Sequence, residues 1–587
     1  MSKKGMERVH IKTDVLIIGG GLAGCMAAIK AREYGVSATI AEKGNTLSSG
    51  CAGTGVDHSW AYIPMIHEQM GWSIDDLLED HSQLIARGFI NRDLLRLVAE
   101  ENYDRMLDLE KMGVRIRFDD SKAPGGFRIV HQFHTMPSSF NFDGYDLKIK
   151  LTREARSRGV NIVNRVMITA LVVSDGQIAG ALGVGTNDGK LYEFRAKAVI
   201  LSTGRANRLT NSVTGVWGNH RMPVNETGDG RVIASRAGLP LINMEFLGWR
   251  YYSIGNFELN LGSPRHTVQP AGSITDESGE TIVPRGQFYD WSNLGEEKVD
   301  AALNRQRALS MGRNARPSFD HLYRQGKGPF YLDLTTATDE EIKYIEWSIS
   351  NEGKGSYYLD YLKKQEGFDF QKDRLEWLPN NREMAGTASS GLVVNNDLET
   401  EVRGLFGAGD EVGGVPWAGA PGAFSMGWKA GEKAAKLART MSQHPDILKT
   451  QTDQLEATCT DIMSNADGLY WREIELAVHN ALDYYAGEMR AEKTLQRGQE
   501  RMKYLKDSLS FGAVNPHELM RCLEVQSIID VSDMVLAASL ERKESRPAPF
   551  GFHRADYPEQ NDAEWLVFLA MRRRGEGFEF DRIPIRQ

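Results

Sequence analysis

The residues with the clearest chemical potential lie near the N-terminus, in the stretch VLIIGGGLAGCMAAIKAREYGVSATIAEKG (residues 15–44). Gly19, Gly21 and Gly24 follow the spacing G-x-G-x-x-G. Such glycines permit a tight turn, let the backbone approach a pyrophosphate and bring a helix close to a strand. The N–H groups at the start of a helix carry a positive dipole end that suits phosphate. The stretch therefore predicts a dinucleotide site.

Two strands and a helix must position these glycines. A short apolar run predicts a buried parallel strand over residues 14–18, and small residues predict a helix over 25–31. A second strand is predicted over 37–41 and ends at Glu42, where the motif needs an acid to bind ribose hydroxyls. A glycine-rich turn in an ordinary βαβ unit remains the alternative.

Two further stretches distinguish between dinucleotides. LSSGCAGTGVDHSW (residues 47–60) is dense in Gly, Ala and Ser, so a flat ligand can lie against its backbone. In TEVRGLFGAGDEVGG (400–414), Asp410 follows a predicted strand and precedes a helix rich in small residues, a place suited to a ribityl or pyrophosphate group. Both favour FAD over a nicotinamide cofactor. A flexible surface loop and a solvent-facing turn are the alternatives.

Composition excludes several classes of protein. The chain has 587 residues, so several domains are expected, and its net charge of −9 offers no basic field to attract nucleic acid. Its four cysteines form no C-x-x-C pair, which excludes a self-contained iron–sulfur cluster and favours a reducing, cytoplasmic location. No apolar run is long enough for direct membrane insertion.

The order of the motifs resembles a known superfamily. The glycine motif, the Ser–Gly loop, AVILSTGRANRL, NETGDGRVIASRAG, GLFGAGD and LERKESR…HRADYP occur in this order. The chain thereby resembles the flavoprotein subunits of the succinate dehydrogenase and fumarate reductase superfamily, and within it the alpha subunits of adenylylsulfate reductase. The resemblance implies an α/β fold: a two-part Rossmann-like FAD-binding domain, an inserted α+β capping domain and a C-terminal helical domain.

The expected domain boundaries follow these motifs. The FAD-binding domain would comprise residues 1–243 and 386–442, the capping domain 244–385 and the helical domain 443–587. Apolar residues at helical spacing over 472–509 support the last of these. The charges of Arg490, Lys493, Arg497 and Arg501 are expected on a solvated face.

The resemblance implies a set of FAD-binding residues. Carried over by motif, they are Gly19, Gly21 and Gly24 at the pyrophosphate; Glu42 and Lys43 at the adenosine; Ser49, Gly50 and Gly55 at the flavin; Ser202, Thr203, Gly204 and Asp229 near the nucleotide; Asp410 at the ribityl chain; and Ser425 and Met426 at the pyrimidine end of the ring. Met426 has helix packing as an equal alternative. Respiratory relatives attach FAD through a histidine in a Ser-His-Thr loop, where this chain has Ser48, Ser49 and Gly50. We therefore expect non-covalent FAD.

The substrate residues depart from those of fumarate-type enzymes. Arg250 stands near their cap histidine, and Arg265 and His266 form the nearest basic pair to their Arg-Gly-Glu. Their His-Gly-Ala-Asn-Arg stretch is replaced by WAGAP (417–421), which has no arginine. Succinate and fumarate are therefore not expected substrates. Arg250, Arg265 and His266 are the candidate catalytic residues, although Arg250 could equally form a structural salt bridge.

Tryptophans offer a second description of the substrate site. Trp60, Trp217, Trp249 and Trp417 could line an apolar pocket or could serve as core residues. Two functions follow. The chain is predicted to be an FAD-dependent oxidoreductase that exchanges two electrons with a small-molecule substrate. Alternatively, it is a flavin electron-transfer subunit of a larger complex with an iron–sulfur, ferredoxin-like partner.

Overall fold

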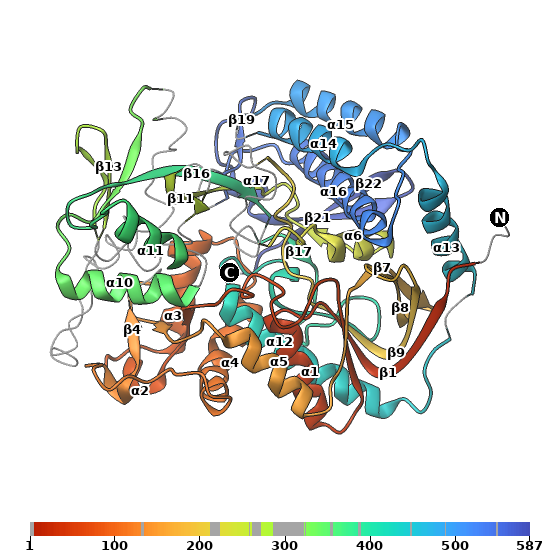
Figure 1. Ribbon diagram of the computed structural model, residues 1–587, viewed down its shortest axis with the longest axis horizontal. Helices are drawn as coiled ribbons and strands as arrows, with labels where there is room; N and C mark the ends of the chain where they lie inside the picture. The colour runs from red at the N-terminus through yellow and green to blue at the C-terminus, as the bar shows by residue number, and fades with distance from the viewer. Residues whose placement is uncertain are drawn as a thin grey trace.

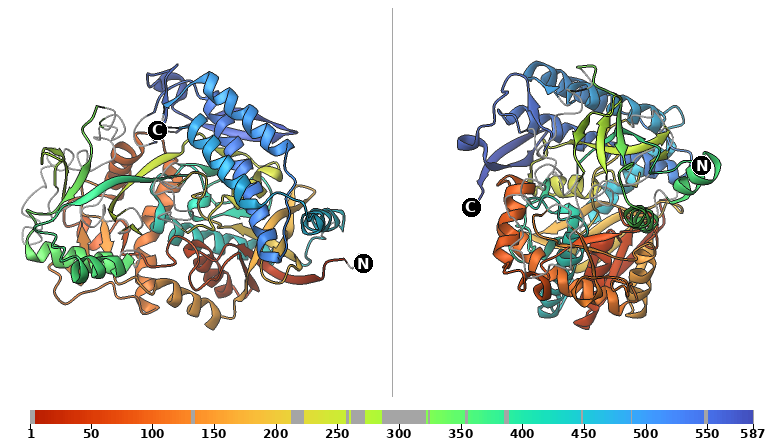
Figure 2. Two further views of the ribbon diagram at one scale, coloured as in Figure 1. Left: turned by 45° about the horizontal axis from the view of Figure 1, so that its top comes forward. Right: turned by 90° about the vertical axis from the view of Figure 1, so that its left-hand side faces the viewer.

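The chain forms three regions: a base, and two further regions that lie next to each other on it. The computed structural model describes residues 5–130, 134–211, 223–256, 259–260, 272–285, 322, 325–352, 356–384, 389–446, 449–487, 489–546 and 550–586. Residues 5–211 and 389–440 form a base, drawn mainly in red, orange and cyan (Figure 1). The green middle segment and the blue C-terminal helices lie next to each other above it, in Figure 1 and in the turned views of Figure 2.

A seven-stranded sheet organises the base. Its order is β6 (Asn161–Asn164), β2 (Ala38–Glu42), β1 (Arg8–Ile18), β9 (Leu191–Leu201), β8 (Gln177–Gly185) and β7 (Val166–Ser174), with β18 (Leu405–Gly407) also paired to β9. β1 is parallel to β2 and β9, and β18 is parallel to β9. The late strand β18 thus completes a sheet that begins at residue 8, as a two-part Rossmann-like domain requires.

The strand β1 is longer than the sequence predicts. The apolar run over residues 15–18 is fully buried, as expected, but β1 already begins at Arg8. Residues 8–13 alternate in exposure and pair in register with residues 191–196 of β9. Backbone pairing with a distant strand therefore extends β1 through polar residues that carry no continuous apolar signal.

Two helices, α1 (Leu22–Glu33) and α12 (Gly419–Thr440), pack against the sheet, and two more, α5 (Leu147–Ser157) and α4 (Arg92–Lys111), pack against α1 and α12 in turn. A Cβ atom on Gly427 would lie 2.4 Å from the Ala23 carbonyl oxygen, and one on Gly431 would lie 2.3 Å from that of Ala27. Only glycine permits this contact between α1 and α12, which brings the N-terminal parts of both helices to the same edge of the sheet.

Shorter elements frame the same edge. A three-stranded sheet has the order β3 (His58–Trp60), β5 (Ser139–Asn141) and β4 (Arg128–Val130). The remaining short elements of the base and its border are α2 (Pro64–His67), α3 (Ile74–Asp80), a π-helix (His81–Ala86), 3-10 turns (Pro124–Gly126 and Gly409–Glu411) and α6 (Asp229–Arg236).

The middle segment forms a separate sheet with its own core. Its strand order is β12 (Leu259–Asn260), β11 (Gly248–Asn256), β16 (Leu375–Glu383), β15 (Phe330–Asp333), β13 (Ser273–Asp276) and β14 (Thr281–Val283), with helices α10 (Asp339–Glu352) and α11 (Ser356–Gln365). Trp347 of α10 donates to Asp143 of the base at 2.9 Å, so this segment touches the base beside the Ser–Gly loop.

The C-terminal segment is helical, as predicted, and also ends in a hairpin. Its elements are α13 (Lys449–Ser464), α14 (Trp471–Tyr485), β19 (Met489–Arg490), α15 (Glu492–Asp507), α16 (Pro516–Glu541), β20 (His553–Arg554), α17 (Asp562–Trp565), β21 (Val567–Arg574) and β22 (Gly577–Pro584). The hairpin extends a four-stranded sheet, in the order β17 (Gly391–Leu392), β10 (Leu241–Ile242), β21 and β22. Strand β21 of the hairpin therefore pairs with β10, which lies just before the middle segment in the sequence.

One expectation about this segment is wrong. Arg490 is fully buried, and its guanidinium donates to the Glu245 carbonyl oxygen and to Ser539 Oγ, each at 2.7 Å. It lies in β19, in the break between α14 and α15, so it does not share the exposed face of α15 that Lys493, Arg497 and Arg501 occupy. The helical spacing of apolar residues continues through the break between α14 and α15, so the sequence pattern does not reveal that break.

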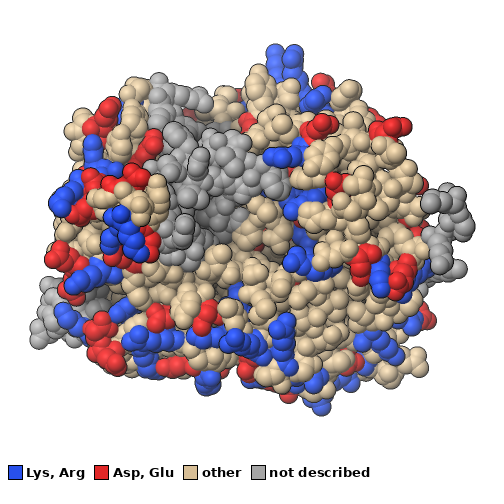
Figure 3. All heavy atoms as spheres, viewed as in Figure 1, with Lys and Arg blue, Asp and Glu red and all other residues tan. Residues whose placement is uncertain are grey.

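The surface carries mixed charge. On the face in Figure 3, acidic and basic side chains lie next to one another along the lower edge, without a large field of one sign. None of the helices in the described ranges combines the length and apolar character needed to cross a bilayer.

Candidate functional site

A pocket opens where the sheet, α1 and α12 meet. The structure brings eleven of the residues singled out from the sequence into its wall: Gly19, Gly21, Glu42, Lys43, Gly50, Gly55, Ser202, Thr203, Gly204, Asp229 and Asp410. They come from segments separated by up to several hundred residues. The parallel strands collect them because their carboxyl ends meet at this edge of the sheet.

The glycine loop is shaped by close backbone contacts. Gly19 has φ +97°, and a Cβ there would lie 2.5 Å from the Ser202 carbonyl oxygen. A Cβ on Gly24 would lie 1.9 Å from the Gly19 carbonyl oxygen, so Gly24 serves the contact between helix and strand. Gly21, by contrast, has no atom within 4 Å of the position of a Cβ, and this open space is part of the pocket.

Glu42 fixes the loop from the second strand. Its carboxylate accepts the Gly20 N–H at 2.7 Å and the Gly44 N–H at 2.6 Å. The side chain is 5% exposed and lines the pocket. The acid therefore orients the turn and still presents an edge to any ribose that enters.

Lys43 takes part in a buried ion network. Its ammonium lies 2.6 Å from Asp229 and 2.8 Å from Glu524 of helix α16. Burial alone would lower the pKa of Lys43, but these two carboxylates raise it above its ordinary value. Lys43 is thus a charged member of the pocket wall, and it connects the wall to the C-terminal helices.

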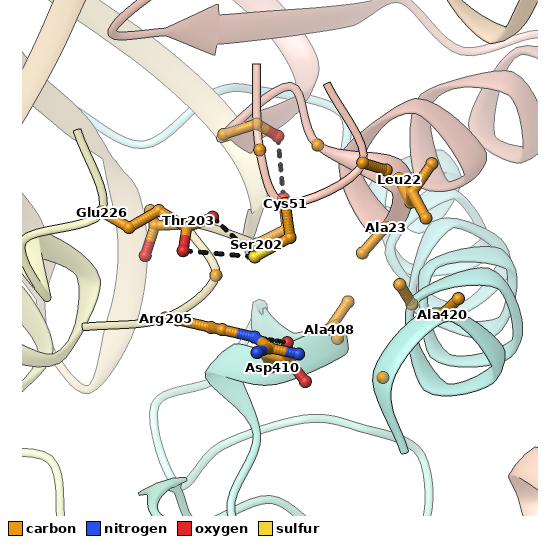
Figure 4. A pocket seen from close by; sticks show the side chains of 18 of the residues that line it. Leu22, Ala23, Cys51, Ser202, Thr203, Arg205, Glu226, Ala408, Asp410 and Ala420 are labelled. Atoms are coloured by element: carbon orange, nitrogen blue, oxygen red, sulfur yellow. Dashed lines mark hydrogen bonds and ion pairs between the residues drawn. The ribbon is translucent and has the colours of Figure 1, made fainter. Parts of the chain in front are cut away.

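Arg205 and Asp410 form the floor of the pocket. The Arg205 Nε donates to Asp410 Oδ2 at 2.6 Å, and in Figure 4 the arginine extends along the pocket to this carboxylate. The other oxygen, Asp410 Oδ1, is buried and has no hydrogen-bond partner among the described residues. Such an orphaned acceptor calls for a donor from a ligand, and the hydroxyls of a ribityl chain are donors of that kind.

Cys51 and Glu226 face each other across the pocket wall. The Cys51 thiol lies 3.0 Å from Glu226 Oε1 and 3.2 Å from Oε2, as Figure 4 shows. Burial raises the pKa of the Cys51 thiol well above its ordinary value, and the Glu226 carboxylate raises it further. Cys51 is therefore a neutral thiol that donates to the acid.

Aromatic side chains line the other end of the pocket. His58, Trp60 and Trp417 belong to its wall. Trp417 has φ +62°, a conformation that bulky residues seldom adopt. Trp60 Nε1 donates to the Trp417 carbonyl oxygen at 3.1 Å, and His81 Nε2 lies 2.9 Å from the Pro416 carbonyl oxygen. Two side chains thus hold the strained turn in place.

The partners of His81 fix its protonation. A carbonyl oxygen only accepts, so His81 Nε2 carries the hydrogen, and Nδ1 accepts from His134 Nε2 at 3.1 Å. Ser138 Oγ lies 2.8 Å from His134 Nδ1, within hydrogen-bond distance. Burial lowers the pKa of His81 to about 4, so His81 is neutral at neutral pH. His81 therefore supports the turn and carries no charge toward the pocket.

Four of the residues expected at FAD lie outside the lining. Ser49 points its hydroxyl at the Gly20 carbonyl oxygen, and Gly24 packs against Gly19. Ser425 donates to the Val98 carbonyl oxygen of α4 at 3.4 Å, and Met426 is fully buried in α12. These four residues therefore contact the loop and the helices around the pocket, and none of them belongs to its lining.

The candidate catalytic residues fall in the middle segment. Arg250 lies in β11, where its backbone pairs with Asn381 of β16. Arg265 and His266 lie outside the described residues, as does Trp217. Trp249 is in β11 beside Arg250. The structure therefore fixes the strand that carries Arg250.

Sequence reasoning missed several wall residues. Arg205, Cys51, Glu226 and Ala423 all line the pocket. Each sits inside or beside a recognised motif: Arg205 directly follows Gly204, and Cys51 follows Gly50. Arg205, Cys51 and Glu226 could have been recognised because they are charged or thiol side chains within motifs made mostly of small residues.

Comparison with known proteins places the chain in a family. Residues 14–425 match the FAD binding domain model, and residues 475–586 match the model for the C-terminal part of fumarate reductase flavoproteins. The first match covers more than half of the sequence, so the chain belongs to the family of FAD-binding flavoproteins. It is a member of the fumarate reductase-like branch of FAD-dependent oxidoreductases, and its cofactor is FAD. The predicted family, cofactor and class of enzyme are confirmed.

Individual relatives extend over nearly the whole chain. One subunit of the fumarate reductase (CoM/CoB) of Methanothermobacter marburgensis is 26% identical and aligns over 97% of this chain and 99% of its own length. The adenylylsulfate reductase structure from Archaeoglobus fulgidus has a TM-score of 0.83 at 23% identity and covers 100% of this chain and 99% of its own. E. coli quinol fumarate reductase has a TM-score of 0.76 at 19% identity, with coverages of 99% and 97%. These structures confirm the predicted fold class.

Proposed function

We propose that the chain exchanges two electrons between non-covalently bound FAD and a small substrate other than succinate or fumarate. FAD, when bound, accepts or delivers the electron pair. The residues of the chain must then hold the cofactor, exclude water and clamp the substrate beside the ring. Residues 244–385 would act as the capping domain over this site.

The pocket wall suggests how FAD lies. The glycine loop at Gly19 and Gly21 would hold the pyrophosphate, and Glu42 would hold the adenosine ribose, next to the apolar side chains of Val166 and Ile168. Asp410 Oδ1 would accept from the ribityl chain because it lacks another donor among the described residues. The flavin ring would then lie beside Gly50 and Gly55, at the end that carries the tryptophans.

The composition of the substrate end supports a substrate that is not a dicarboxylate. The segment from Trp417 to Pro421 lines the pocket and contains no basic residue, whereas fumarate-type enzymes carry an arginine there. Trp60 and Trp417 offer flat apolar faces in its place. Arg250, Arg265 and His266 are the proposed ligands of a single anionic group on the substrate.

An anaerobic reoxidation experiment tests this proposal. The bound flavin is photoreduced, and its absorbance is followed as fumarate, larger aromatic enoates, enoyl thioesters or adenylylsulfate is added. We expect fast reoxidation by one of the last three and slow reoxidation by fumarate. Rapid turnover of fumarate would refute the proposal. The variants Arg250→Ala and His266→Ala should slow reoxidation by the active compound, with Arg236→Ala, a surface arginine, as control.

An iron–sulfur partner is the second part of the proposal. The relatives from Methanothermobacter and Rickettsia are named as subunits, and this chain aligns with nearly their full length. Its own four cysteines are all free thiols that lie apart in the sequence, so one-electron traffic would need a second protein. Their reduced state also supports the cytoplasmic location. Purification of the native complex and iron analysis test this part; reoxidation by ferredoxin-like proteins alone would favour the electron-transfer role.

A further inference from the structure

Lys148 of α5 is buried behind the glycine loop in an unusual environment. Lys148 is only 2% exposed to solvent. Its ammonium has no ion-pair partner among the described residues, unlike that of Lys150 on the same helix. Its ammonium donates to the Gly20 carbonyl oxygen and lies 3.3 Å from Cys25 Sγ. A buried cation without a neighbouring carboxylate is costly, so a lysine at this position calls for an anion that the protein itself does not supply.

The Gly20 carbonyl is held by more than Lys148. Ser49 Oγ donates to the same oxygen at 3.3 Å, and Cys25 Sγ approaches it at 3.5 Å. On the other side of the residue, Glu42 accepts the Gly20 N–H at 2.7 Å. Both polar groups of Gly20 are therefore fixed by buried side chains, and the plane of the peptide that follows is fixed as well.

This clamp determines where the next N–H points. In a trans peptide the C=O of Gly20 and the N–H of Gly21 point in opposite directions. Since the carbonyl is directed toward Lys148, which is not part of the pocket wall, the Gly21 N–H is directed toward the pocket, which Gly21 lines. Gly21 is also the N-cap of α1, and no side chain caps this helix or places an acid in its first turn.

We propose that Lys148 is a positioning residue for the cofactor pyrophosphate: it locks and polarises the Gly20–Gly21 peptide so that its N–H binds the phosphate, and it supplies the matching positive charge. A cation at the carbonyl end strengthens the donor at the amide end, because hydrogen bonds in a chain polarise one another. The inference rests on the placement of the pyrophosphate proposed above. Cys25 and Ser49 complete the cluster that holds the carbonyl.

The main test compares variants of the purified holoenzyme. Lys148→Met removes the charge and the donor, while Lys148→Gln keeps a donor without the charge. The matched control is Lys150→Met on the same helix, whose ammonium pairs with Asp146 at 2.8 Å near the surface. Release of FAD after dilution is followed by flavin fluorescence. We expect release about tenfold or more faster in Lys148→Met, an intermediate rate in Lys148→Gln and a wild-type rate in the control.

A second readout separates positioning from a general structural role. The two phosphorus-31 resonances of bound FAD should shift in Lys148→Met and Lys148→Gln, while the visible spectrum of the flavin and the midpoint of thermal unfolding stay close to wild type. Faster release together with unshifted phosphorus resonances would overturn the inference, since a loosened fold gives that pattern. If Lys148→Met does not fold, Lys148→Arg carries the test: it should keep the wild-type release rate while Lys148→Gln does not.

One more variant separates this inference from the proposed cofactor placement. A Cβ on Gly21 meets no protein atom within 4 Å and its φ of −67° suits alanine, so Gly21→Ala disturbs only a ligand in the pocket. If Gly21→Ala leaves FAD release and the phosphorus resonances unchanged, the placement of the pyrophosphate is wrong. If Gly21→Ala changes both and the Lys148 variants change neither, the placement holds and the role of Lys148 is wrong.

Discussion

Glu524 is the centre of a buried ion network that joins the FAD pocket to helix α16. Its fully buried carboxylate lies 2.8 Å from Lys43, 2.7 Å from Arg208 and 2.7 Å from Arg521. Burial alone would raise the pKa of Glu524, but Arg208, Lys43 and Arg521 hold it far below its ordinary value. Glu524→Gln keeps the shape of the side chain and removes the charge, so it isolates the electrostatic contribution.

The expected loss of stability depends on which carboxylates still contact Arg208 and Lys43 when Glu524 loses its charge. Removing one partner of a buried ion pair costs about 3–5 kcal/mol, because the remaining charge stays buried. Arg208 is fully buried but keeps Glu475 at 3.0 Å, and Lys43 keeps Asp229 at 2.6 Å. Because both cations keep another carboxylate, we expect a loss at the lower end of this range, about 3 kcal/mol in the free energy of unfolding. That loss corresponds to about a hundredfold increase in the ratio of unfolded to folded protein. FAD should also leave faster, since Lys43 lines the pocket.

Urea unfolding of the holoenzyme, followed by tryptophan and flavin fluorescence, measures this loss. The control is Asp360→Asn, which breaks the exposed Lys364–Asp360 pair and should cost less than about 0.5 kcal/mol. The native pKa of Glu524 is depressed, so its contribution is present above its ordinary pKa of 4.5 and is lost as the pH falls below it. The gap between wild type and Glu524→Gln should therefore be full at neutral pH and shrink in acid. A gap no larger than that of the control would refute the reasoning.

Three other outcomes are expected. Acid precipitation should leave the flavin in the supernatant, because Ser48, Ser49 and Gly50 offer no histidine for a covalent bond; flavin in the pellet would contradict this. Cys51 should react slowly with iodoacetamide at neutral pH, and Glu226→Gln should speed the reaction by lowering the raised thiol pKa, as mass spectrometry of the peptide would show. Burial lowers the pKa of His81 to about 4, so stability should fall by up to about 3 kcal/mol as the pH drops from 6.5 toward 4, and His81→Gln should flatten that fall in urea titrations.

The sequence predicts the local parts of this molecule well, for a physical reason. Gly19, Gly21 and Glu42 lie in one βαβ unit, where strand, turn and helix are set by residues a few positions apart. Asp410 was recognisable too, because a strand end next to a helix start is visible in a short window. Motif order then identified the family, even though each motif alone is short.

Contacts between segments that are distant in the chain could not be predicted from the sequence. Lys43 and Glu524 meet across 481 positions of the chain, and nothing near either residue indicates the other. Arg490 has the spacing of a surface charge, yet a break in the helices buries it against Glu245. Lys148 reads as one basic residue in an amphipathic helix, and only the packing of α5 behind the glycine loop gives it a role. Tertiary packing decides all three.

The turn at Trp417 places a strained backbone in the pocket wall. A bulky residue with φ +62° costs about 1–3 kcal/mol, so the surrounding contacts must impose it. Trp60 and the neutral His81 supply those contacts through the carbonyl oxygens of residues 417 and 416. A glycine would adopt this backbone conformation without strain. The conformation of the turn therefore does not account for a tryptophan at this position, and the reason must lie in its side chain. Trp417 belongs to the pocket wall and packs against Leu84 and Ile85, so the strained residue helps to build that end of the wall.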